Sequence, residues 1–131
     1  MVALSFLLFV SYGKIIFLIM NNKFGIPEDK LEKLFQRDRK CSYCHKKMIF
    51  PYDTNNRKDS ATIEHLNFDG PFYWKDGLQI EDIVIVCSSC NSSRGIKPLF
   101  DWFKASYCRE RNINEKTVSN SVMKYLKKNE N

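Results

Sequence analysis

Two Cys-x-x-Cys pairs constrain this chain more than any other feature of its sequence. The first pair is Cys41 and Cys44, and the second pair is Cys87 and Cys90. Zinc prefers four soft ligands in a tetrahedron, and two residues between cysteines let one tight turn present both sulfurs to one ion. The pattern therefore predicts a structural Zn²⁺ site that uses four of the five cysteines.

The stretch between the two pairs, residues 45–86, is longer than the linker of a simple zinc ribbon, which has about 15–20 residues. We therefore expect a folded unit between the pairs. At 131 residues the chain suits one small domain with an appended element rather than two separate cores. Structural zinc contributes roughly 10–16 kcal/mol in zinc-finger peptides, which is the scale of a whole domain's stability, so chelation is expected to unfold the chain.

Polar residues of a second kind accompany the cysteines. Glu64 and His65 are adjacent inside the long stretch, and Asn91 follows the second cysteine of the second pair, with Arg94 three residues further on. Over about residues 41–97 this combination resembles the HNH (His-Me finger) endonucleases, in the subgroup whose ββα-metal motif is braced by a four-cysteine zinc. The resemblance implies an α+β fold, with a small zinc-stapled ββα-metal (HNH) core and flanking helices.

The resemblance also implies roles for individual residues. His65 is expected to be the general base that activates water, a role that suits an imidazole titrating near neutral pH. Glu64 and Asn91 are expected to hold a catalytic Mg²⁺ or another divalent cation through oxygen. Arg94 and Lys97 are expected to contact the phosphate. The implied activity is metal-dependent hydrolysis of phosphodiester bonds in nucleic acid, with DNA as the expected partner.

Three positions depart from the commonest pattern of the family. Glu64 stands where an aspartate is usual, and its longer side chain alters the metal geometry. Asp82 stands where an asparagine usually orients the catalytic histidine, and an acid there either accepts a hydrogen bond from the imidazole or adds charge to the site. Asn91 stands where a histidine is common, which is a frequent variation.

Two other classes of protein share part of the pattern. A non-catalytic zinc module that binds nucleic acid accounts for the cysteines and the charge, but it gives Glu64, His65 and Asn91 no shared purpose. The run from Cys41 to His45 also matches the attachment motif of c-type haem, but that motif leaves Cys87 and Cys90 unexplained.

The net charge agrees with an anionic partner without requiring one. The formal charge is +6, from 21 basic and 15 acidic residues, and four zinc-bound thiolates together with one Zn²⁺ lower it to about +4. A moderate positive charge of this size serves phosphate binding and solubility equally well.

Residues 1–19 are almost all apolar and allow several interpretations. Translation that begins at Met20 would make the segment no part of the protein. A membrane anchor is energetically allowed, and membrane association is expected only if residues 1–19 are translated. A secretory signal fits poorly, because no basic residue precedes the apolar run and no small-x-small cleavage site follows it. The lysines and arginines that follow favour a cytoplasmic domain.

Hydrophobic periodicity predicts the remaining elements. We expect a helix from Pro27 within residues 20–40 and short strands at residues 48–52, 61–66 and 83–87. Residues 98–131 are expected to form two C-terminal helices, one from residue 99 to about 107 and one capped by Asn114.

Overall fold

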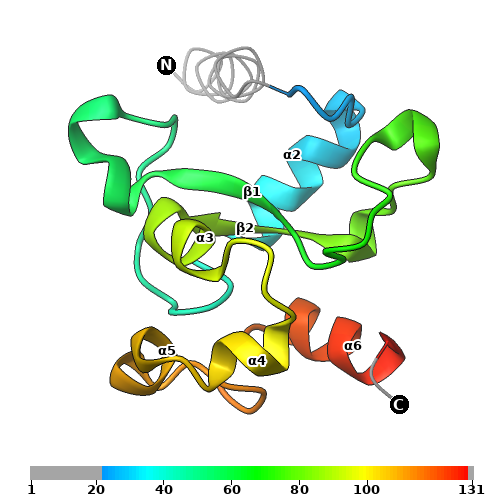
Figure 1. Ribbon diagram of the computed structural model, residues 1–131. Coiled ribbons are helices and arrows are strands. Elements are labelled where there is room, and N and C mark those ends of the chain that lie inside the picture. Colours follow the sequence, from blue (N-terminus) through cyan, green and yellow to red (C-terminus); the bar gives the residue numbers. More distant parts are fainter. Residues whose placement is uncertain (1–21, 130–131) are drawn as a thin grey trace.

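The computed structural model describes residues 22–129, and its centre is an antiparallel pair of strands. Strand β1 (Ala61–His65) pairs with β2 (Ile83–Cys87), so that Ala61 lies opposite Cys87 and His65 lies opposite Ile83. Helix α3 (Ser88–Arg94) follows β2 directly and packs against both strands (Figure 1). The predicted α+β class and both of these strands are confirmed.

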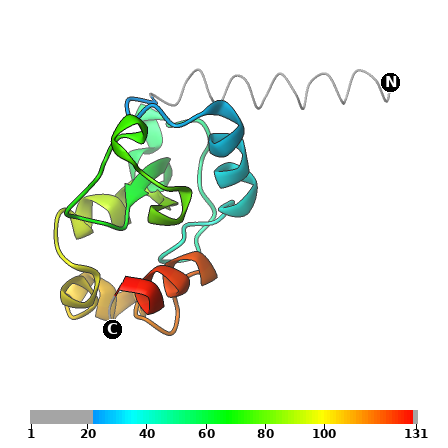
Figure 2. The same ribbon diagram turned by 90° about the vertical axis from the view of Figure 1, so that its right-hand side faces the viewer.

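Helix α2 (Glu28–Arg37) covers the other side of the strand pair, as Figure 2 shows. It begins directly after Pro27, and its first turn carries two acids, which suit the positive end of the helix dipole. Leu31 and Leu34 form the buried stripe that packs into the core. The helix predicted from Pro27 is therefore confirmed.

The outer edge of β2 is covered by the segment that follows α2. The Ile85 N–H donates to Asp38 Oδ2 at 2.9 Å, and the Ile85 carbonyl accepts from the Ser42 N–H at 3.2 Å. Arg37 holds the Asp38 carboxylate in place with two bonds of 2.8 Å. Buried backbone groups at the edge of a two-stranded sheet need hydrogen-bond partners. Here the two bonds to Ile85 attach the segment that carries the first cysteine pair to β2.

Three short helices form a layer below the strand pair (Figures 1 and 2): α4 (Leu99–Phe103), α5 (Ser106–Arg111) and α6 (Asn120–Asn129). The single helix predicted from residue 99 to 107 is wrong, because Ala105 has an extended backbone, with ψ 152°, and separates α4 from α5. The cap predicted at Asn114 is also wrong. Its side chain accepts from the Lys116 N–H in a turn, and α6 begins only at Asn120.

The connections around the strands carry short 3₁₀ helices. These are η1 (Thr54–Asp59), η2 (Trp74–Asp76) and η3 (Ile80–Asp82). The strand predicted at residues 48–52 is wrong, because only Ile49 pairs there, through an isolated bridge to Ser60. Pro51 offers no N–H to continue that pairing.

Within residues 22–129, no helix is long and apolar enough to cross a membrane. The apolar segment at residues 1–19, and the choice between Met1 and Met20 as the start, lie outside the described residues.

Candidate metal centre and histidine site

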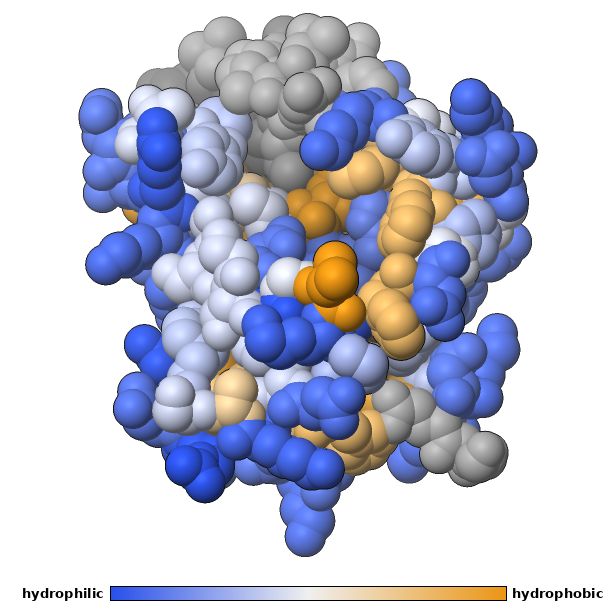
Figure 3. Space-filling view, viewed as in Figure 1, coloured by the Kyte–Doolittle hydropathy of each residue, from blue (hydrophilic) through white to orange (hydrophobic). Residues whose placement is uncertain are grey.

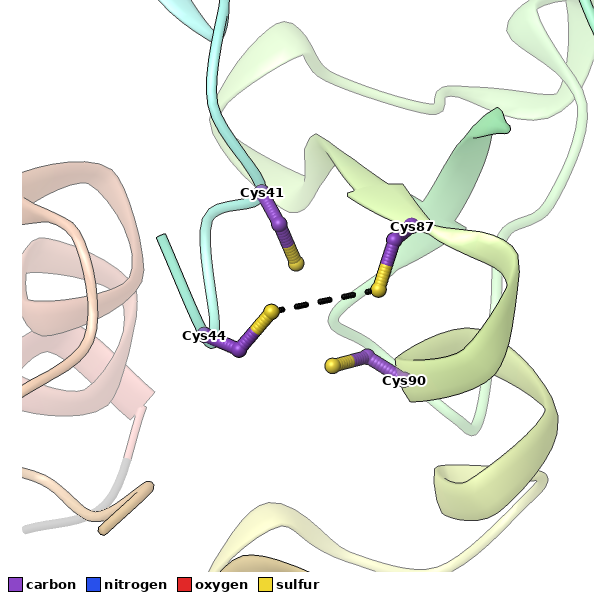
Figure 4. Close-up of side chains that lie close together, drawn as sticks. All are labelled: Cys41, Cys44, Cys87 and Cys90. Atoms are coloured by element: carbon purple, nitrogen blue, oxygen red, sulfur yellow. Dashed lines mark hydrogen bonds between the residues drawn. The ribbon is translucent and has the colours of Figure 1, made fainter. Parts of the chain in front are cut away.

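The four predicted metal ligands lie together. Two come from the turn after α2, one ends β2 and one lies in α3: Cys41, Cys44, Cys87 and Cys90. Their Sγ atoms all lie within 4.8 Å of one another, and those of Cys44 and Cys87 are 3.9 Å apart (Figure 4). Sulfurs bound to a tetrahedral zinc at about 2.3 Å lie about 3.8 Å apart, so the cluster fits that ion. The predicted four-cysteine cluster is confirmed.

The backbone around the first pair forms a tight turn that directs both sulfurs inward. Lys40 and Lys47 pair as an antiparallel bridge, and the Cys41 N–H donates to the Lys46 carbonyl at 2.9 Å. The His45 N–H donates back to the Cys41 carbonyl at 2.9 Å, and His45 has a φ of 65°. The left-handed conformation at His45 closes the turn immediately after the second ligand.

Contacts among the thiols shift their pKa values in opposite directions. The hydrogen bond with Cys41 lowers the pKa of Cys44, whereas the hydrogen bond with Cys44 raises the pKa of Cys41. The bond with Cys41 also lowers the pKa of Cys87 to about 7. Metals bind the thiolate form, so binding of a cation by the four cysteines releases the protons that remain on their thiols.

A buried polar cluster joins the first cysteine turn to β1 and α3. Tyr43, which lies between the cysteines of the first pair, donates from its hydroxyl to Glu64 Oε2 at 2.9 Å. Arg94 Nη1 lies 3.4 Å from the same oxygen. Burial raises the pKa of Glu64 to about 7, although Arg94 and Tyr43 act in the opposite direction. The Glu64 side chain therefore lies inside the protein, between the cysteine turn and α3.

Arg94 uses its guanidinium to hold the chain that leaves β1. It is 1% exposed and donates to the carbonyls of His65 at 2.7 Å, Leu66 at 2.9 Å and Lys97 at 2.9 Å. This placement directs Arg94 away from any phosphate at the surface. Lys97 is exposed, and its Nζ donates to the Ser93 carbonyl at 3.1 Å, so it is the surface cation of the two predicted phosphate contacts.

His65 ends β1 and is half-buried between aromatic rings. Its Nε2 lies 3.0 Å from the Phe72 carbonyl, and its ring contacts Phe24, with ring centroids 4.4 Å apart. A carbonyl only accepts, so Nε2 carries the proton of the neutral ring and Nδ1 is left as an acceptor. Burial lowers the pKa of His65, and the charges of Lys23 and Arg94 add to this effect. The imidazole is therefore neutral at pH 7, with one basic nitrogen.

Asp82 lies near His65, and its charge raises the pKa of His65 by less than burial lowers it. Its backbone carbonyl accepts from the Leu66 N–H at 2.8 Å, which fixes the start of the long connection after β1. Of the two roles expected for Asp82, the hydrogen bond from the imidazole is made instead to the Phe72 carbonyl, and Asp82 acts on His65 through its charge.

Asn91 lies on α3 and faces β1. Its Nδ2 donates to Thr62 Oγ1 at 3.0 Å and to the Ile63 carbonyl at 3.2 Å. The carbonyl partner fixes the amide orientation, because only the NH₂ group can donate to it. The amide oxygen, Oδ1, is thereby left as the group that Asn91 can offer to a ligand.

Glu64 and Asn91, as they lie, do not complete a site for a hard cation. Mg²⁺ requires several oxygen ligands in near-octahedral geometry. Asn91 offers one oxygen, whereas Glu64 Oε2 is held by Tyr43 and Arg94. Within residues 22–129, the four-cysteine cluster is the one group of three or more His, Cys, Asp or Glu side chains arranged to hold a metal ion.

Comparison of the chain with models of known protein families, with curated proteins and with solved structures gives no match. The fold and the site thus define a small α+β protein with a four-cysteine cluster that bridges its strand pair and the turn after α2.

Two residues of this site were not identified from the sequence. Tyr43 lies inside the first Cys-x-x-Cys pair, and that position is the signal from which its proximity to the metal centre follows. Phe72 contributes a backbone carbonyl to His65, and no side-chain type indicates such a contact.

Proposed function

We propose that the chain is a zinc-braced, metal-dependent endonuclease of the HNH type that hydrolyses phosphodiester bonds in DNA. The observation that carries the proposal is the state of His65. It is a neutral imidazole at the end of β1, it donates from Nε2 to a carbonyl, and its Nδ1 is left as an acceptor. It lies on a strand–strand–helix unit that the four cysteines attach to the turn after α2.

The proposed reaction needs a base for the attacking water and positive charge near the phosphate. His65 Nδ1 accepts the proton of the water, and the bond from Nε2 to the Phe72 carbonyl keeps the ring in one orientation during that step. The negative charge of Asp82 stabilises the imidazolium that forms. Lys97, exposed three residues after the end of α3, is the cation assigned to the phosphate.

Dependence on a divalent cation is part of the proposal and rests on the resemblance to HNH enzymes. Such an ion, when bound, neutralises charge on the phosphate and assists the departing oxygen. Asn91 Oδ1 is the oxygen that the chain offers to it. We assign no catalytic step to Glu64, because its carboxyl group is held by Tyr43 and Arg94.

Nicking of supercoiled plasmid by zinc-loaded protein, with Mg²⁺ or Mn²⁺ added, tests the proposal. We expect His65→Ala to lower the nicking rate by about 10²–10⁴-fold, the usual contribution of a general base, with unchanged zinc content and circular dichroism. His45→Asn is the matched control, because it removes the other histidine and asparagine tolerates the positive φ at that position. Equal nicking by His65→Ala and the parent protein would refute the assignment.

A non-catalytic zinc module that binds nucleic acid is the second candidate. It is favoured by the structural contacts of two predicted catalytic residues, since Glu64 lies in a buried ion pair and Asn91 is anchored to β1. Binding of DNA by the parent protein, without cutting under any divalent metal, would support this candidate.

A further inference from the structure

Three aromatic side chains form a group beside His65. This group, the aromatic platform, consists of Phe24, Phe72 and Tyr73. The His65 ring contacts Phe24 and Phe72, with centroids 4.4 and 5.4 Å away, and Phe24 lies 6.1 Å from Tyr73. Phe72 and Tyr73 are 41% and 44% exposed. Figure 3 shows apolar side chains gathered on the right of this face, where the connection between β1 and β2 lies in Figure 1.

Hydrogen bonds hold the platform in one arrangement. The Trp74 N–H donates to the Phe24 carbonyl at 2.9 Å, which attaches the chain before α2 to the connection after β1. Asn67 Nδ2 donates to the Pro71 carbonyl at 2.9 Å, and the Leu78 N–H donates to the Tyr73 carbonyl at 3.2 Å. These bonds hold the backbone that carries the two exposed rings, although exposure of large apolar groups opposes solubility.

Two lysines lie over the rings of the platform. Lys23 Nζ is 5.2 Å from the centroid of Phe24, and Lys75 Nζ is 5.9 Å from the centroid of Tyr73. In the part of the chain that the structure describes, neither ammonium group forms an ion pair. Rings that stack on bases, next to cations that meet phosphates, are the combination by which proteins hold single strands of nucleic acid.

We propose that the aromatic platform binds unpaired nucleotides beside His65, so that the substrate of the proposed nuclease is single-stranded or locally unpaired DNA. Bases in a duplex already stack on their neighbours, and only an unpaired base presents its face to a protein ring. The inference rests on the proposed function. Both the ring and the backbone carbonyl of Phe72 contact the His65 imidazole. A nucleobase stacked on the platform therefore lies next to His65, the proposed general base.

The small number of charges near the platform limits how strongly its binding of nucleic acid depends on salt. The same connection carries the carboxylates Asp69 and Asp76, so the local attraction for phosphate comes from Lys23 and Lys75 rather than from an excess of positive charge. Binding is therefore expected to weaken only slightly with salt, with a logarithmic slope of about −1.4 for two phosphate contacts on a single strand.

The test is fluorescence anisotropy with the zinc-loaded parent protein and no other divalent cation, so that the proposed reaction does not proceed. The probes are a fluorescein-labelled single-stranded oligonucleotide of mixed sequence, the same sequence as a duplex, and vesicles of anionic lipid. Tyr73→Ala removes one ring of the platform. Tyr52→Ala is the matched control, because Tyr52 is 39% exposed and lies before the start of β1, at the end of the strand opposite to His65.

We expect tighter binding of the single strand than of the duplex. Tyr73→Ala should weaken single-strand binding by about 5-fold to 150-fold, the range for loss of one stacked base, and Tyr73→Trp should restore it. Tyr52→Ala should bind like its parent. Equal binding of single strand and duplex, equal effects of the two alanine substitutions, or binding of vesicles without binding of the oligonucleotide would each overturn the inference.

This experiment separates the platform from the catalytic proposal, because it measures binding without the cation that the proposed reaction requires. Selective single-strand binding together with a parent protein that cuts nothing would leave the platform in place and remove the nuclease. Cutting by the parent together with unchanged binding by Tyr73→Ala would remove the platform alone.

Discussion

The two ends of the strand pair differ in how their side chains are held. At one end Ala61 lies opposite Cys87, and four cysteines converge in an enclosed cluster. At the other end His65 lies opposite Ile83, half-buried, with contacts to a backbone carbonyl and to partly exposed rings. The cysteine end thus suits a metal that stabilises the fold, and the histidine end suits a ligand from solvent. Substitutions at the first should change stability, and substitutions at the second should change activity.

The largest effect is expected at the cysteine end. Cys90→Ala removes a metal ligand, and since structural zinc contributes about 10–16 kcal/mol, the variant is expected to be unfolded and free of zinc. Circular dichroism and measurement of bound zinc check this outcome. Cys108→Ala is the matched control, because Cys108 is also fully buried but lies outside the cluster, and it should keep both zinc and fold. A folded Cys90→Ala protein would contradict the comparison.

The next effect concerns the buried ion pair that connects the two ends. Arg94→Met leaves Glu64 buried without its cationic partner, and removal of one member of such a pair costs about 3–5 kcal/mol. Urea unfolding of zinc-loaded protein at pH 8, above the pKa of Glu64 in the parent, measures the loss. Arg109→Met is the control, since Arg109 is exposed and its replacement should change the unfolding free energy by less than about 0.5 kcal/mol. A loss below about 1 kcal/mol for Arg94→Met would show that the pair is not a structural link.

A dependence of stability on pH follows from the same cluster. Burial raises the pKa of Glu64 in the folded state to about 7, above its ordinary value of 4.5, so the folded state binds this proton more tightly than the unfolded state does. The resulting stabilisation is complete below pH 4.5 and is lost as the pH rises to about 7.

Glu64→Gln removes this titration and isolates its effect. The difference in unfolding free energy between the parent and Glu64→Gln should decrease by up to about 3 kcal/mol between pH 4.5 and 8. Urea unfolding of both proteins across this range, with zinc present, measures that difference, and any acid loss of zinc common to both cancels. A difference that does not change with pH would show that Glu64 ionises at its ordinary pKa.

The smallest effect on stability is expected at Thr62, whose side chain anchors Asn91 of the proposed site to β1. Thr62→Val keeps the shape of the side chain but removes the oxygen that accepts from Asn91 and donates to the Val86 carbonyl, at a cost of about 1 kcal/mol. The plasmid-nicking rate should fall by more than this loss of stability accounts for, because Asn91 loses one of the two hydrogen bonds that orient its amide. Thr54→Val, at an exposed threonine, is expected to change neither quantity. A rate that falls no more than the loss of stability accounts for would show that the orientation of Asn91 does not matter to the proposed site.

The spacing of cysteines and the periodicity of apolar residues predicted the metal cluster and the main elements around it. The four-cysteine cluster follows from two Cys-x-x-Cys turns, because each turn presents both of its sulfurs on one side. The helix after Pro27 and the strand at residues 83–87 follow from periodic apolar residues bounded by turn residues.

Contacts between residues that are distant in the sequence could not be predicted from such patterns. Arginine is usually exposed at the surface, so the sequence does not indicate that Arg94 is buried. Its burial is explained by its contacts with the Glu64 carboxylate and with three backbone carbonyls. The break at Ala105 has a similar origin, because the apolar residues on both sides are compatible with one continuous helix. There the tertiary packing of α4 and α5 prevails over helix propensity.

The register between β1 and β2 determines which changes in chain length this fold can accept. Side chains alternate between the two faces of a strand, so deletion of one residue within β1 would turn Glu64 outward and His65 inward. The connections at residues 50–60 and 66–82 carry no such alternation. Insertions and deletions during the divergence of this chain are therefore expected in those two connections, and the second of them carries Phe72 and Tyr73. New binding preferences can thus arise by changes in loop length, while the strands that connect the cysteines to the histidine keep a constant number of residues.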